Sequence, residues 1–219
     1  IALATKPHFT KVVACELNAY KAAQLRTLPA LHPGRDIEVL HGDCNREVPL
    51  YLDKLRRRDP DWAFAPTFAF VDQLSAEVTW ATLQSLATFK SPASPTKPEI
   101  WLYFGDSFLP RGLAGINDPN GEMNATYASR IDLMFGNTRW RDIHEARRQG
   151  QINAGQLRDE LVNLMRYQLQ SELGYAVTYP LAFSYEQRPL YTMIFATDHP
   201  AGGRIMNHVL KDAQAALER

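Results

Sequence analysis

The sequence is poor in the features that mark several functional classes. Its two cysteines, Cys15 and Cys44, are too few for a disulfide framework or a zinc site of their own, and its six histidines show no metal-ligand spacing. The 24 basic and 24 acidic residues cancel, so the net charge does not indicate a nucleic-acid partner. There is neither an apolar run of membrane-spanning length nor a secretory signal, so we expect no membrane partner and a cytoplasmic location.

Three short apolar runs, by contrast, each end in an acid. The acids are Glu16, Asp43 and Asp72, and the steps of 27 and 29 residues between them each suit one strand–helix–strand unit. Buried parallel strands are continuous apolar runs, and ligands bind at their carboxyl ends, so we expect the three acids along one edge of one sheet. This arrangement suits a nucleoside cofactor, and we expect S-adenosylmethionine.

The first two acids and their neighbours are the predicted cofactor-binding residues. Glu16, followed by Leu17, can accept both ribose hydroxyls, because a carboxylate has only acceptors. Gly42 lets the backbone approach a ligand, while Asp43, next to Cys44, can accept the exocyclic amine of adenine. Structural alternatives exist for both acids, because an acid stabilises a helix N-terminus and Asp is a good N-cap residue.

A second set of residues is predicted to act on the substrate. Asp72 is the candidate catalytic residue and a further cofactor contact, since it can orient a nucleophile or take its proton; its alternative role is a helix cap. Asp106 ends a fourth apolar run and is expected at the same crevice. Arg111 can clamp an anionic substrate, and Trp140 lies in a basic cluster where it can stack on a ligand. The alternatives are a solvated loop arginine and solvated helix ends.

The remaining pattern predicts an α/β fold with a mostly parallel sheet and a C-terminal antiparallel strand pair. The predicted strands span residues 11–17, 37–41, 67–71, 99–104, 176–185 and 190–197. The stretch 105–150 is expected to be an irregular or helical insertion or lid. Because the chain begins at Ile1, without Met, we also expect that a first strand and a glycine-rich turn are missing before it.

Several short segments resemble the three-Cys-motif partner protein family, bacterial proteins with a methyltransferase-like fold. The segments are residues 9–16 (FTKVVACE), 42–45 (GDCN), 70–72 (FVD), 78–80 (VTW), 133–140 (LMFGNTRW) and 189–200 (PLYTMIFATDHP). The resemblance implies a single Rossmann-like domain over residues 1–219, a sandwich of the class I methyltransferase type. It also implies methyl transfer from S-adenosylmethionine to an unidentified substrate, and a partner protein that carries a three-cysteine motif.

One departure from the family keeps rival functions open. Family members tend to have Asp-Pro-aromatic-Gly after the third strand, where this chain has Asp-Gln-Leu-Ser over residues 72–75. The altered loop favours a non-catalytic partner protein that keeps the fold. A less favoured rival is an NAD-dependent oxidoreductase, because an acid such as Glu16 suits that ribose too; the C-terminal strand pair argues against it.

Overall fold

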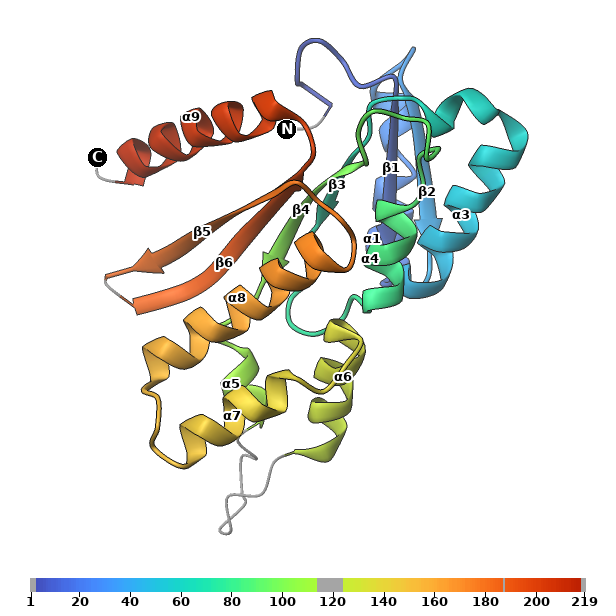
Figure 1. Ribbon diagram of the computed structural model, residues 1–219. Coiled ribbons are helices and arrows are strands. Elements are labelled where there is room, and N and C mark those ends of the chain that lie inside the picture. The colour runs from blue at the N-terminus through green and yellow to red at the C-terminus, as the bar shows by residue number, and fades with distance from the viewer. Residues whose placement is uncertain (1–2, 114–123, 187, 218–219) are drawn as a thin grey trace. The chain divides into compact units, whose positions relative to one another are not determined.

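The structure is a computed structural model of the 219-residue chain, and it describes residues 3–113, 124–186 and 188–217. The chain divides into two compact units, an N-terminal unit over residues 1–59 and a C-terminal unit over residues 60–219. Both combine helices with strands, which confirms the mixed α/β class (Figure 1). The expectation of a single domain over residues 1–219 stays a prediction.

The N-terminal unit is a two-stranded parallel sheet with its connecting helices. Its elements in chain order are β1 (Lys11–Glu16), α1 (Ala19–Leu25), α2 (Leu28–Leu31), β2 (Asp36–His41) and α3 (Cys44–Arg58). The two strands pair in register from Lys11 opposite Asp36 to Glu16 opposite His41. Two helices connect the strands, because α1 ends at Leu25 and a new helix with Pro29 in its first turn begins at Leu28.

A polar cluster of four residues ties the start of β1 to β2 and α3. The ammonium of Lys11 lies 2.9 Å from Asp36 and 3.2 Å from Glu38, and the hydroxyl of Tyr51 donates to Glu38 over 2.9 Å. Burial, followed by the bond to Glu38, raises the pKa of Tyr51 to about 12. The phenol is therefore neutral at physiological pH and acts as a hydrogen-bond donor inside this unit.

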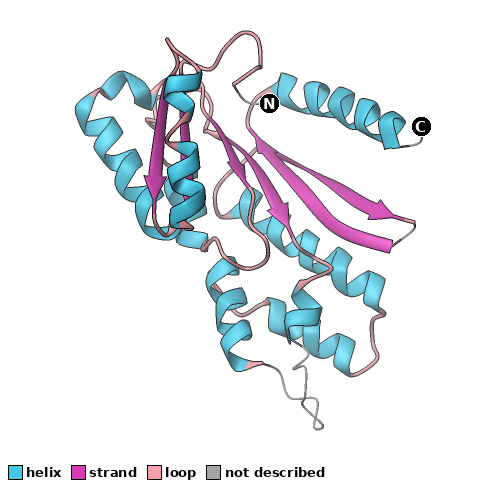
Figure 2. Cartoon of the chain, turned by 180° about the vertical axis from the view of Figure 1, so that it is seen from behind, coloured by secondary structure: helices cyan, strands magenta, loops and turns pink. Residues whose placement is uncertain are grey.

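The C-terminal unit is built on a four-stranded mixed sheet. Its elements are η1 (Pro60–Ala63), β3 (Phe68–Val71), α4 (Trp80–Ala87), β4 (Glu99–Phe104), α5 (Leu109–Leu113), α6 (Ala125–Phe135), α7 (Trp140–Arg148), α8 (Ala154–Ser171), β5 (Val177–Tyr185), β6 (Arg188–Thr197) and α9 (Pro200–Leu217). The strand order is β3-β4-β6-β5, with β3 parallel to β4 and β6 antiparallel to both of its neighbours. The predicted C-terminal antiparallel pair is therefore confirmed, and Figure 2 shows it as a long ribbon.

The central strands of this sheet form the core of the unit. In β4, Ile100, Leu102 and Phe104 are fully buried and alternate with partly exposed residues, as the strand period requires. In β6, every residue from Thr192 to Thr197 is buried, which requires cover on both faces. Helices α8 and α9 both contact the β5–β6 pair and supply part of that cover (Figure 1).

One sequence expectation differs from the structure. The strands form two sheets, one parallel and one mixed, where a single mostly parallel sheet was expected. The stretch 105–150, expected to be irregular or helical, contains α5, α6 and α7, and residues 114–123 of that stretch lie outside the described residues. The N-cap of α3 is Asp43, whose side chain accepts from the backbone N–H of Asn45.

Candidate functional site

The carboxyl ends of β1 and β2 bring the first two predicted acids to one edge. The strands run parallel with Glu16 opposite His41, and the backbone N–H of Gly42 donates to the carbonyl of Glu16 over 3.1 Å. Asp43 follows Gly42 and begins α3. The structure therefore places Glu16 and Asp43 at the same end of the same sheet, as the sequence predicts, and we call this end the acidic edge.

Each carboxylate of the acidic edge also organises the local backbone. The Oε1 atom of Glu16 accepts from the N–H of Asn18 over 2.7 Å, and Asn18 in turn caps α1. The Oδ1 atom of Asp43 accepts from the N–H of Asn45 over 2.9 Å, so the structural role predicted as the alternative for Asp43 is present. A carboxylate offers about four lone-pair positions, and one backbone bond leaves each acid with acceptor capacity for a ligand.

Two neighbours of the acids fit a ligand that approaches closely. Gly42 has φ of +147°, and a Cβ atom there would lie 2.8 Å from Cγ of Glu47, so only glycine fits without displacement. Leu17 follows Glu16 and is 71 % exposed, an unusual position for a leucine and one that offers an apolar face. Carboxylates that can accept from hydroxyl groups lie here beside a backbone without a side chain and an exposed apolar residue. This combination suits a nucleoside.

The two cysteines beside these acids form no disulfide in the structure. Burial raises the pKa of the Cys15 thiol to about 11, and Cys44 and the carboxylates of Glu47, Asp43 and Glu16 add to the effect. Its Sγ atom lies 3.7 Å from the carbonyl oxygen of Gly42. Because the thiolate is the reactive form, a protonated Cys15 acts as a packing residue and not as a nucleophile.

The third acid, Asp72, is an exposed residue directly after β3 in the C-terminal unit. Its predicted alternative as a helix cap is wrong, because Thr79 caps α4. The next residue, Gln73, is 2 % exposed: its amide donates to the carbonyl of Tyr103, and its oxygen accepts from the N–H groups of Glu77 and Val78. The loop after β3 is thus held by a buried glutamine. That all three acids share one edge stays a prediction.

Trp140, predicted to stack on a substrate, lies in the core of the C-terminal unit. It is 1 % exposed, and its Nε1 atom donates to Asp132 over 2.9 Å. Asp132 also accepts two hydrogen bonds from Arg141, whose guanidinium lies 5.2 Å from the centre of the Trp140 ring. In the structure this tryptophan is a packing anchor for α6 and α7, and its role toward a substrate stays a prediction.

A cavity of about 440 Å³ in the C-terminal unit contains a concentration of positive charge. Arg111, the predicted anion clamp, lines it from α5. The other polar residues that line it are Ser107, His144, Arg147, Arg158 and Arg188. They come from the segment after β4, from α7 and α8, and from the start of β6, and we call this site the arginine cavity.

Asp106, expected at the crevice, is the acid next to this lining. It is 6 % exposed and its Oδ1 atom has no hydrogen-bond partner among the described residues. Burial raises the pKa of Asp106, against the opposing effects of Thr192 and of the Arg158 charge. Burial thus opposes the charged form of Asp106, the carboxyl group that interacts with the charge of Arg158.

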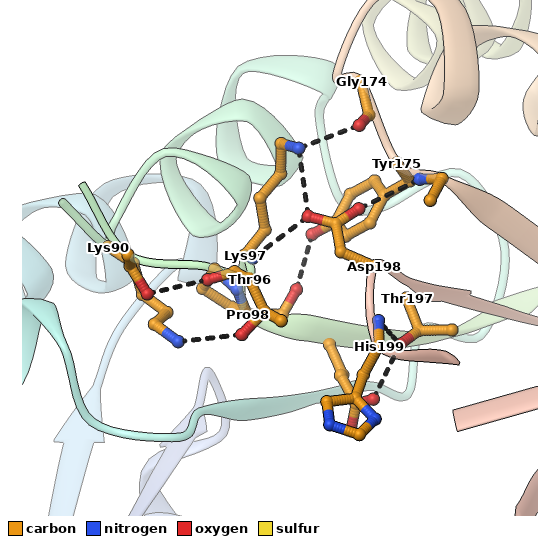
Figure 3. Close-up of polar contacts among 12 residues, drawn as sticks. Lys90, Thr96, Lys97, Pro98, Gly174, Tyr175, Thr197, Asp198 and His199 are labelled. Carbon is orange, nitrogen blue, oxygen red and sulfur yellow. Dashed lines mark hydrogen bonds and ion pairs between the residues drawn. The ribbon is translucent and has the colours of Figure 1, made fainter. Parts of the chain in front are cut away.

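A further polar cluster, around Asp198, has a structural role (Figure 3). The carboxylate of Asp198 accepts from the backbone N–H of Ala176 over 2.9 Å, and from both the N–H and the ammonium of Lys97 over 3.1 Å. The ammonium also donates to the carbonyl of Gly174, and the hydroxyl of Tyr175 donates to that of Pro98. These contacts fasten the ends of β6, β5 and β4 together.

The sequence predicts only some of the residues that line the arginine cavity. Arg111 was predicted as an anion clamp, and Arg147 belongs to the basic cluster around Trp140. Nothing in the sequence pattern points to Arg158 or Arg188, because the four arginines are spread over more than 70 residues of a chain without net charge.

Comparisons with protein-family models, with curated proteins and with solved structures find no match to this chain. Within the described residues, no group of three or more His, Cys, Asp or Glu side chains is placed to hold a metal ion. In the same part of the chain, no helix has the length and apolar character needed to cross a membrane.

Proposed function

We propose that the protein is a class I methyltransferase-like protein that binds S-adenosylmethionine at the acidic edge, with a cytoplasmic location. The observation that carries the proposal is the position of Glu16 and Asp43 at neighbouring carboxyl ends of an in-register parallel pair. Ligands of open α/β sheets bind at such ends. The C-terminal antiparallel pair supports the methyltransferase-type sandwich that the family resemblance implies, whereas the division of the strands into two sheets does not.

In this proposal each residue has a limited role. Glu16 accepts the ribose hydroxyls, Asp43 accepts the adenine amine, and the exposed Leu17 packs against the base. Bound S-adenosylmethionine supplies an electrophilic methyl group. Asp72 of the C-terminal unit stays the predicted catalytic residue, as a carboxylate that can orient a nucleophile and take its proton, and alignment of the reacting atoms would provide much of the rate.

Calorimetric titration with S-adenosylmethionine, S-adenosylhomocysteine and NAD tests the proposal. We expect saturable binding of the two adenosyl ligands and none of NAD. Glu16→Gln keeps the acceptor for the Asn18 N–H but loses the charge, so affinity should fall about 10-fold or more. The matched control is Asp53→Asn, an acid of the same unit that pairs with Arg56 and Arg57 on the surface of α3; it should bind like the wild type.

A non-catalytic partner protein is the second candidate, and the buried Gln73 favours it. Gln73 holds the loop after β3 through three backbone contacts, in the place where an amino-methylating enzyme would hold a flipped base. In this case the chain binds a three-cysteine-motif protein without catalysis. Absence of adenosyl binding together with capture of a purified three-cysteine-motif protein would support this candidate and reject the first.

A further inference from the structure

Positive charge lines the arginine cavity, and Asp106, the acid whose charge acts on Arg158, is not part of the lining. Arg111, Arg147, Arg158 and Arg188 contribute four positive charges, and no acidic side chain is among the described residues that line the cavity. None of the four forms an ion pair within the described parts of the chain. Like charges gathered in one cavity repel one another, and a bound anion would relieve that repulsion.

The contacts that these arginines do make leave them able to donate to a ligand. The guanidinium of Arg111 lies over the ring of Phe108, 5.7 Å from its centre, and Arg147 donates over 3.4 Å to the carbonyl of Ile152. A guanidinium carries five N–H donors, so a single long bond or a ring contact occupies a small part of its capacity. The remaining donors are available for an oxyanion.

The start of α8 adds positive potential at the same place. Ala154, the first residue of this 18-residue helix, lines the cavity together with Leu157 and Arg158. Asn153 and Gln156 form a capping box that occupies the N–H of Gln156. The positive end of a helix dipole favours an anion, and here it supplements the guanidinium groups.

The size and chemistry of the cavity define the class of ligand. A volume of about 440 Å³ lies within the range of small-molecule sites. Guanidinium groups match the oxygens of phosphate in bidentate fashion, and a phosphate monoester carries about 1.5 to 2 negative charges at neutral pH, more than a carboxylate. Leu157, Pro110 and Pro189 give the cavity an apolar wall for the rest of the molecule.

We propose that the arginine cavity binds a phosphate-bearing small molecule of about nucleotide size, with Arg111, Arg147, Arg158 and Arg188 as the phosphate ligands. The inference does not rest on the proposed cofactor site, because Glu16 and Asp43 belong to the N-terminal unit and all four arginines belong to the C-terminal unit. Binding at one site can therefore be measured even if binding at the other is absent.

Calorimetric titration at low salt with inorganic phosphate, adenosine monophosphate and citrate tests this site. We expect saturable binding of adenosine monophosphate and weaker binding of phosphate, with citrate weaker than adenosine monophosphate. Arg111→Gln and Arg188→Gln should each lower the affinity for adenosine monophosphate at least about 10-fold. The matched control is Arg130→Gln, an exposed arginine of α6 outside the cavity lining, which should bind like the wild type.

Several results would overturn the proposal. They are absence of binding by both phosphate ligands, a preference for citrate, and an equal loss of affinity in the Arg130→Gln control. A single-stranded oligonucleotide that binds far more tightly than adenosine monophosphate would also overturn it, in favour of a nucleic-acid surface. Unchanged urea unfolding of the Arg111→Gln and Arg188→Gln variants would show that both are folded, so that their loss of adenosine monophosphate binding reports on the site.

Discussion

The N–H of Gly42 donates a hydrogen bond of 3.1 Å to the carbonyl of Glu16, and this bond makes two parallel strands end together. It is the last rung of the β1–β2 ladder, and the next residue after Gly42 is the acid that caps α3. Glu16 and Asp43 therefore lie at the same end of the sheet because of backbone geometry. A nucleoside that bound them would meet a site fixed by the sheet and not by a loop.

Gly42→Ala should destabilise the protein more than the same change at another glycine of the N-terminal unit. At φ of +147° an alanine is strained, and its Cβ would lie 2.8 Å from Cγ of Glu47. We expect a loss of about 2–3 kcal/mol in the free energy of unfolding, measured by urea denaturation. Gly34→Ala is the control, because Gly34 has φ of +81° with nothing near its Cβ; strain alone should cost about 1 kcal/mol. Equal losses would contradict the close approach of Glu47.

Asp132→Asn should remove a pH-dependent part of the stability. The guanidinium of Arg141, and then the indole N–H of Trp140, lower the pKa of Asp132 against the opposing effect of burial. Stabilisation from a lowered pKa is complete above the unfolded value near 4 and is lost as the pH falls through the folded value. The stability gap between wild type and variant should therefore shrink in acid, as urea denaturation at several pH values would show.

Asparagine at position 132 can still accept from the Trp140 N–H, so the comparison isolates the ion pair. Asp159→Asn, an exposed change beyond the first turn of α8, is the control, and its free energy of unfolding should stay close to that of the wild type. A gap between wild type and Asp132→Asn that stays constant from neutral to acid pH would contradict the prediction.

Asp198→Asn should destabilise the C-terminal unit. Burial opposes the charge of Asp198, but the N–H groups of Ala176 and Lys97 and the Lys97 ammonium outweigh it and lower the pKa (Figure 3). An amide replaces one acceptor oxygen with a donor, so it can no longer accept from both the Ala176 N–H and the Lys97 donors. We expect a loss of about 2–4 kcal/mol in thermal or urea unfolding. The exposed Asp159→Asn in α8 should change little, and similar losses in both variants would refute the assignment.

Gln73→Ala should destabilise the protein, because the buried side chain of Gln73 holds the loop after β3 by hydrogen bonds to the backbone. The variant leaves the carbonyl of Tyr103 and the N–H groups of Glu77 and Val78 without their side-chain partner. We expect a loss of about 2–4 kcal/mol in the free energy of unfolding. Gln84→Ala, an exposed change within α4, provides the comparison and should be nearly neutral. A small effect at both positions would mean that Gln73 does not organise this loop.

Sequence pattern predicted the strands well because each is short, apolar and bounded by turn residues. The strand Glu99–Phe104 has the predicted bounds, and the antiparallel pair near the C-terminus differs by no more than two residues at either end. It did not predict α7, because its sequence WRDIHEARR is mostly charged and its apolar anchor is the single buried Trp140. Trp140, Ile143 and Ala146 recur at helical spacing, but this pattern covers only nine residues and was read as part of a basic cluster.

The site was predictable where it depends on neighbouring strands and not where it depends on tertiary packing. Glu16 and Asp43 are recognisable because two strand ends of one parallel pair lie at one edge by rule. The arginines of the cavity come from four separate segments, and each alone looks like a solvated surface residue. The net charge of zero gives no sign that the arginines lie together, because it is a sum over the whole chain.

Hydrogen–deuterium exchange with and without S-adenosylhomocysteine is the most direct test of the central claim. If the acidic edge holds the adenosyl group, the ligand should slow exchange in peptides that cover Glu16–Asn18 and Gly42–Asn45, and Glu16→Gln should reduce that protection. Protection confined to the C-terminal unit, or no change at both strand ends under saturating ligand, would contradict the account.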